Sequence, residues 1–126
     1  MDSLRAGLVI YHPSDWAILL IRDARTSMWS FPKGRIEPYD RDLVDAAVRE
    51  TYEETGFVLD KHYLLLTRMF ETHGNTNLLY AEAKTPTLPF SSCVEQHVAE
   101  VAWVAVRDIK SIHCNFPLRA WRSRQQ

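Results

Sequence analysis

A central segment with start and stop signals for a helix constrains the fold of this chain most. Asp42 is a favoured N-cap residue, and Gly56 is favoured just after a last turn, because glycine adopts left-handed backbone angles at little cost. These signals predict a helix over Leu43–Thr55, and apolar runs flank it on both sides. Only a few arrangements bury a single central helix together with strands that precede and follow it.

The flanking apolar runs are short and rich in β-branched residues, which is typical of strands. The expected strands are Ala6–Tyr11, Trp16–Ile21, Trp29–Phe31, Tyr63–Phe70, Leu78–Ala83 and Val98–Val106. His73–Asn77 is expected to form a turn, and Pro32–Asp42 a loop. Short helices are expected at Asp108–Ile112 and after Pro117. Strands, one central helix and further strands together predict an α+β fold.

Length and composition narrow the class of protein. The 126 residues suit one domain spanning residues 1–126, and the formal net charge of −1 argues against a face built for duplex DNA. No apolar run approaches the roughly 18 residues of a membrane span, and Met1–Arg5 lacks the apolar part of a signal peptide. Cys93 and Cys114 lack metal-site spacing, so we expect free thiols and a soluble, cytoplasmic protein without membrane partners.

Aromatic residues leave two interpretations open. Trp121 lies among arginines near the C-terminus, so its ring could stack on a base or pack a terminal helix against the core. The same alternatives, recognition of a base or sugar and a place in the core, apply to three further rings, those of Trp16, Tyr39 and Tyr80.

The predicted helix carries three acids near its C-terminal end. Glu50, Glu53 and Glu54 are three or four residues apart and share one side, while Val44, Val48 and Tyr52 are expected to face the core. Each like-charge pair costs about 0.2–0.5 kcal/mol on an isolated helix. The helix dipole also disfavours anions at this end. A solvated acidic face is one interpretation; a divalent cation bound by hard oxygen ligands is the other.

The segment from Gly34 to Phe57 resembles the box that defines the Nudix family, Gly-x5-Glu-x7-Arg-Glu-U-x-Glu-Glu-x-Gly-U, in which U is bulky and apolar. The second half matches at Arg49, Glu50, Glu53, Glu54, Gly56 and Phe57, with Thr51 at one U position. The first half is one residue longer than the pattern, and Asp40 stands where the early glutamate is expected.

The resemblance implies an α/β/α sandwich around a mixed β-sheet and hydrolysis that depends on Mg²⁺ or Mn²⁺. Carried over by position, the metal ligands would be Glu50, Glu53, Glu54 and the backbone of Gly34. The catalytic residues would be Glu53, Glu50, Arg49, which orients the acids, and a general base. Glu95 is favoured as that base over His97, and Glu100 is expected on the surface. Substrate contacts are expected from Lys33, Arg35, Arg5 and Tyr80.

The segment Trp29–Ile36 narrows the choice of substrate class. This segment resembles the catalytic domain of mRNA decapping enzymes, and its Pro-Lys-Gly also occurs in diadenosine tetraphosphate hydrolases and some diphosphoinositol polyphosphate hydrolases. The resemblance implies cleavage of a diphosphate linkage in a nucleoside diphosphate-linked substrate, such as capped RNA or a dinucleoside polyphosphate. The alternatives are a diphosphoinositol polyphosphate phosphohydrolase and a Nudix-fold module that binds a nucleotide or RNA without cutting it. The sequence predicts no oligomeric state.

Overall fold

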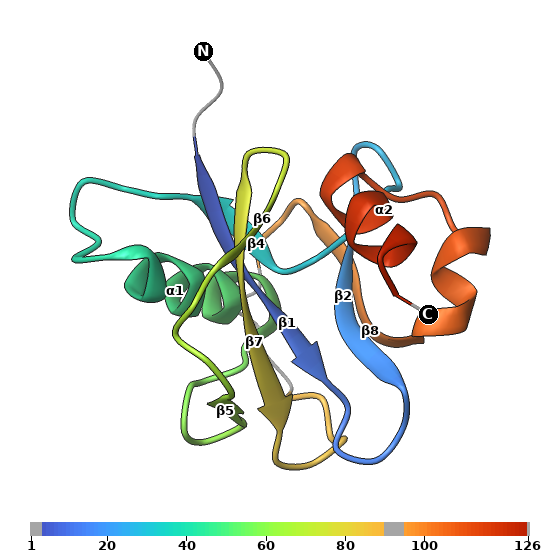
Figure 1. Ribbon diagram of the computed structural model, residues 1–126, viewed down its shortest axis with the longest axis horizontal. Coiled ribbons are helices and arrows are strands. Elements are labelled where there is room, and N and C mark those ends of the chain that lie inside the picture. The colour runs from blue at the N-terminus through green and yellow to red at the C-terminus, as the bar shows by residue number, and fades with distance from the viewer. Residues whose placement is uncertain (1–3, 90–94, 126) are drawn as a thin grey trace.

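The computed structural model describes residues 4–89 and 95–125, and within these residues eight strands form one mixed sheet (Figure 1). The elements in chain order are β1 (Arg5–Tyr11), β2 (Ala17–Asp23), β3 (Trp29–Ser30), β4 (Lys33–Arg35), α1 (Leu43–Thr55), β5 (Tyr63–Leu65), β6 (Glu71–His73), β7 (Thr76–Ala83), β8 (Val98–Ala105), the 3₁₀ helix η1 (Val106–Ser111) and α2 (Phe116–Ser123). No helix in the described part of the chain combines the length and apolar character needed to cross a membrane.

Two long ladders make up most of the sheet. β1 pairs with β7 in parallel along its whole length, and β2 pairs with β8 antiparallel. β1 and β2 themselves pair at Tyr11↔Ile18, next to the turn that joins them. Further from this turn β4 pairs with β1 and β3 pairs with β2, so the segment 29–35 fills the space between the diverging strands. This arrangement places β4 beside the start of β1 and β3 beside the end of β2.

Helices cover both faces of the sheet, which confirms the predicted α+β class and the α/β/α sandwich. Successive strand residues point to opposite faces, so Leu8 and Ile10 pack towards Ala46 and Ala47 of α1. Val9 faces the other way, into a cluster with Leu118 and Trp121 of α2 and Ile109 of η1. The core is therefore divided by the sheet into two halves.

Both caps predicted for α1 are present. The Asp42 side chain accepts a hydrogen bond of 2.8 Å from the Asp45 amide, and Gly56 has a φ of 81°. The prediction that Tyr52 faces the core is wrong, because its side chain is 47% exposed. α1 instead buries the side that carries Ala46, Ala47, Glu50, Thr51, Glu54 and Thr55. The two small alanines let the helix approach the sheet, and this turns Glu50 and Glu54 inward.

Three predictions, one each of a loop, a strand and a turn, need correction. The expected loop Pro32–Asp42 contains β4, which forms because its backbone groups pair with β1. The expected strand Tyr63–Phe70 ends at Leu65, and a separate β6 begins at Glu71. The predicted turn His73–Asn77 is shorter, because β7 already starts at Thr76 and pairs with β6.

The environment of Trp121 decides between the two interpretations of its ring. Trp121 is fully buried, meets Phe31 edge-on at 5.7 Å between ring centroids, and so packs α2 against the core. Cys114 is a buried free thiol, as expected, while Cys93 lies outside the described residues.

Candidate active site

The acids of α1 lie directly against β4. The Lys33 amide donates a hydrogen bond of 2.8 Å to Glu54 Oε1, and a Cβ added at Gly34 would overlap the Glu50 carboxylate. The absence of a side chain at position 34 therefore leaves room for the Glu50 carboxylate, which a larger residue would displace. The helix periodicity brings the acids to one side, and β4 holds two of them in place.

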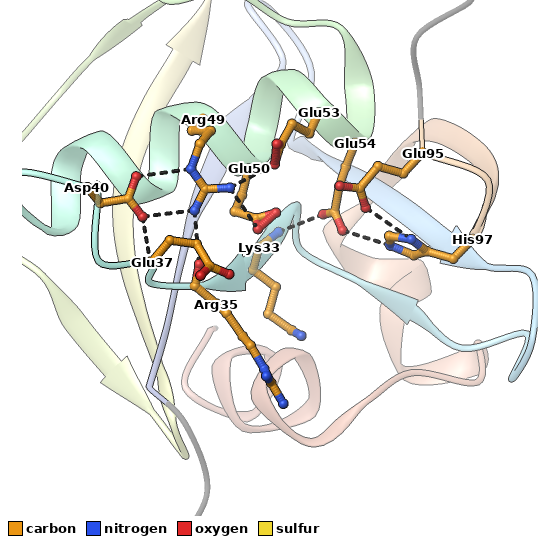
Figure 2. A network of polar contacts seen from close by, with 10 residues as sticks. All are labelled: Lys33, Arg35, Glu37, Asp40, Arg49, Glu50, Glu53, Glu54, Glu95 and His97. Carbon is orange, nitrogen blue, oxygen red and sulfur yellow. Dashed lines mark hydrogen bonds and ion pairs between the residues drawn. The ribbon is translucent and has the colours of Figure 1, made fainter.

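Arg49 connects the acids with the loop before α1 (Figure 2). Its Nε and Nη2 donate to the two carboxylate oxygens of Asp40 at 3.0 and 2.8 Å, and its Nη1 donates to Glu53 Oε1 at 2.8 Å. Nη2 also donates to the Arg35 carbonyl. Asp40 in turn accepts from the Glu37 amide at 2.8 Å. Asp40, which stands where the family pattern has a glutamate, thus contacts both the loop and Arg49 despite the extra residue.

The buried Asp40–Arg49 pair should contribute to stability. The Asp40 side chain is only 3% exposed, and its bonds to Arg49 lower its pKa below the ordinary value. We expect Asp40→Asn to lower the free energy of unfolding by about 1–3 kcal/mol, because Arg49 loses its ion pair and one of the two carboxylate acceptors becomes an NH2 donor that faces the guanidinium. Urea unfolding would measure the change.

Asp45→Asn is the matched control for that variant. Asp45 also pairs with an arginine, but its partner Arg41 is 86% exposed, so solvent already screens the pair. The control should unfold close to wild type. Equal destabilisation of both variants would contradict the importance assigned to the buried pair.

A turn before β8 brings Glu95 and His97 to the same site. His97 Nε2 lies 3.0 Å from Glu54 Oε2, and its Nδ1 lies 3.0 Å from Glu95 Oε2. Glu95, the favoured general base, and His97, the second choice, are therefore both beside the acids of α1. Glu100 instead forms an exposed pair with Arg22 at 3.3 Å.

The electrostatics of this cluster fit a cation. Burial, followed by the charge of Glu54, raises the pKa of Glu50 to about 7. Burial raises the pKa of Glu54 to about 8, although the hydrogen bond from the Lys33 amide opposes the shift. Buried carboxylates acquire such pKa values where positive charge is scarce. Oxygen atoms of Glu50, Glu53 and Glu95 lie within 4.8 Å of one another, and so do ligand atoms of Glu54, Glu95 and His97. The donors present thus suit a divalent metal ion.

The acids lie in the wall of a cleft of about 440 Å³. Three of the four residues expected to contact substrate, Arg5, Lys33 and Arg35, line this cleft. Figure 2 shows the Lys33 and Arg35 side chains extending to the same side of the site. The cleft thus combines acids that suit a metal with cations that suit phosphate groups.

The remaining aromatic candidates lie elsewhere. Tyr80 belongs to the opposite half of the core, where its hydroxyl donates to Glu71 and accepts from Trp121. Tyr39 is exposed, with the Arg49 guanidinium 5.3 Å from its ring centroid. Trp16 is exposed and stacks on Tyr11.

Sequence reasoning did not identify three charged residues that line the cleft. Asp23 and Arg25 form an ion pair of 2.9 Å at the end of β2, and Glu37 follows β4. Asp23 and Arg25 follow a predicted strand and Glu37 lies in a predicted loop, positions that many surface residues share. Their place in the cleft depends on the pairing of β3 and β4 with β2 and β1.

Comparison with known proteins identifies the family. A sequence model of the NUDIX domain matches residues 1–124, so the chain belongs to the Nudix family of hydrolases. The Schizosaccharomyces pombe mRNA decapping complex subunit 2 is 29% identical over 117 residues. That match covers 88% of this chain but only 15% of the length of the yeast protein.

Solved structures share the fold. The Nudix hydrolase RenU from M. smegmatis superposes with a TM-score of 0.76 at 19% identity, over 97% of this chain and 82% of RenU. A C. elegans Ap4A hydrolase, in a binary complex, gives a TM-score of 0.73 at 23% identity, over 94% of this chain and 96% of that one.

Proposed function

We propose that this Nudix hydrolase cleaves a diphosphate linkage in a nucleoside diphosphate-linked substrate and requires Mg²⁺ or Mn²⁺. The observation that carries the proposal is the convergence of Glu50, Glu53 and Glu95 within 4.8 Å. Glu50 and Glu95 line the same cleft as Arg5 and Lys33. Acids gathered this closely suit a cation, and cations beside them suit the phosphates of a substrate. Cytoplasmic location and a single domain over residues 1–126 remain predictions.

The residues of the cleft have different proposed roles in the reaction. Glu50, Glu53, Glu54 and the Gly34 carbonyl would hold the metal, which when bound neutralises phosphate charge and lowers the pKa of bound water. Arg49 fixes the Glu53 carboxylate through a bond of 2.8 Å. The Glu95 carboxylate would accept the proton of the attacking water.

The proposed class of substrate follows from the basic side chains that line the cleft and from the names of the relatives. Arg5, Lys33 and Arg35 would bind the phosphates that flank the scissile linkage. Tyr80 remains part of the proposed substrate set, although it would have to act from the opposite half of the core. The names of the relatives favour capped RNA and dinucleoside polyphosphates. A diphosphoinositol polyphosphate and binding without cleavage are the alternatives.

Removal of metal is the first test. The chain should be assayed with Mg²⁺ and with Mn²⁺ against capped RNA, diadenosine tetraphosphate, ADP-ribose and a diphosphoinositol phosphate. We expect nucleotide release from at least one of the first three substrates, and loss of release when EDTA is added, because the acids then lack their counter-charge. Activity that survives EDTA would contradict the metal requirement. Tight nucleotide binding without any cleavage would favour the binding module.

A further inference from the structure

His97 places a nitrogen donor among the acids of the cleft. Its two ring nitrogens face Glu54 and Glu95, each at 3.0 Å (Figure 2). One ligand atom from each of these three residues lies within 4.8 Å of the others. Ligands of one transition metal ion lie about 2.0–2.2 Å from it, so opposite ligands are separated by about 4 Å. A small contraction of this group would therefore enclose an ion.

The turn that carries Glu95 and His97 is fixed by its own backbone. The Glu95 amide donates to the Glu53 carbonyl at 3.1 Å, which ties the turn to α1. The Val98 amide donates to the Glu95 carbonyl at 3.0 Å, and the Ala24 amide donates to the His97 carbonyl at 2.7 Å. A ring held on such a turn is already oriented towards the acids, which is the requirement for a preorganised ligand.

The possible metal ligands of the cleft also separate into two groups of different chemistry. Glu50, Glu53 and Glu95 offer oxygen alone, whereas Glu54, Glu95 and His97 offer two oxygens and one nitrogen. Mg²⁺ prefers oxygen ligands and retains its water, while imidazole is a better ligand for first-row transition ions. Glu95 belongs to both groups and would lie between the two positions.

We propose that His97 ligates a metal ion together with Glu54 and Glu95, and that this mixed nitrogen–oxygen position selects Mn²⁺ over Mg²⁺. The inference rests on the proposed function, because it concerns the metal of the same cleft. It assigns His97 a role as ligand in place of a role as general base. Glu95 would ligate through one carboxylate oxygen, and its other oxygen would accept the proton of the attacking water.

The test uses Mn²⁺ bound to the whole chain and detects nitrogen on the metal directly. Electron spin echo modulation should show ¹⁴N coupling from an imidazole in the wild type. The coupling should be absent in His97→Gln and retained in His113→Gln, a control that removes an exposed histidine. Calorimetry should show that His97→Gln reduces the preference for Mn²⁺ over Mg²⁺ by about tenfold or more. Residues that only hydrogen-bond to metal ligands already contribute about 10–100-fold to metal affinity, so loss of a ligand should have at least this effect.

Each outcome separates this inference from the proposed function. Mn²⁺ binding and metal-dependent cleavage without ¹⁴N coupling would overturn the role of His97 and leave the hydrolase intact. Coupling that persists in His97→Gln would overturn it too. Failure of Mn²⁺ and Mg²⁺ to bind at all would overturn both proposals. Thermal unfolding of each variant would show that loss of coupling is not loss of structure.

Discussion

Replacement of Glu53 by glutamine should reduce kcat by about a thousandfold while the protein remains folded. A metal ion in this chemistry is worth several kcal/mol of transition-state stabilisation, and each 1.4 kcal/mol is about tenfold in rate. Glutamine has nearly the size of glutamate but lacks its charge, so the metal loses a proposed ligand. The Glu53 side chain is 35% exposed, so the substitution leaves no buried group without solvent.

Glu82→Gln is the matched control for this variant. Glu82 is an exposed acid on β7 and is not among the described residues that line the cleft. Its replacement should leave kcat and KM unchanged. Steady-state rates and circular dichroism should be measured for both variants with Mg²⁺ and Mn²⁺. A Glu53→Gln enzyme that retains wild-type kcat would remove Glu53 from the metal site.

The metal-free protein should lose stability as pH rises from about 4.5 to about 8. The folded protein holds Glu50 at a pKa of about 7 and Glu54 at a pKa of about 8, against an ordinary value of 4.5. Within this window the folded state binds protons that the unfolded chain has released. The free energy of unfolding therefore falls with rising pH, and the loss is complete above the folded pKa values. One pKa unit corresponds to about 1.4 kcal/mol, so the two carboxyls together correspond to a loss of up to about 8 kcal/mol.

Thermal unfolding in EDTA between pH 5 and 9 would measure this effect. Carboxyls whose pKa is lowered, such as those of Asp23 and Asp40, titrate below the window and do not mask it. Glu54→Gln should unfold at a higher temperature than wild type at pH 8 and show a weaker pH dependence. Added Mn²⁺ should stabilise the wild type most at high pH. A melting temperature that rises across the window would contradict the burial of these charges.

Local signals predicted the parts of the fold that depend on neighbouring residues. Asp42 and Gly56 fixed both ends of α1, because capping is decided within a few residues. The convergence of Glu50 and Glu54 followed from helix periodicity alone. Those acids are buried, however, because Ala46 and Ala47 let the helix lie close to the sheet. The sequence pattern instead predicted that the opposite side of the helix, with Val44, Val48 and Tyr52, faces the core.

Contacts between distant segments explain what could not be predicted. β4 consists of Lys33, Gly34 and Arg35, whose composition suggests a loop, and only its pairing with β1 makes it a strand. The His97–Glu54 contact joins residues on either side of three strands, and no spacing rule connects them. The contact of Tyr80 with Trp121 depends on which face of the sheet each residue of β7 points to, and the sequence pattern does not decide this.

The loop before α1 shows how chain length and side-chain length compensate for each other. Asp40 has one methylene fewer than the glutamate of the family pattern, and the loop that carries it is one residue longer. The two departures cancel at the guanidinium, where Asp40 still makes bonds of 3.0 and 2.8 Å. A search that demands fixed intervals between motif residues would thus reject a chain whose interactions are complete.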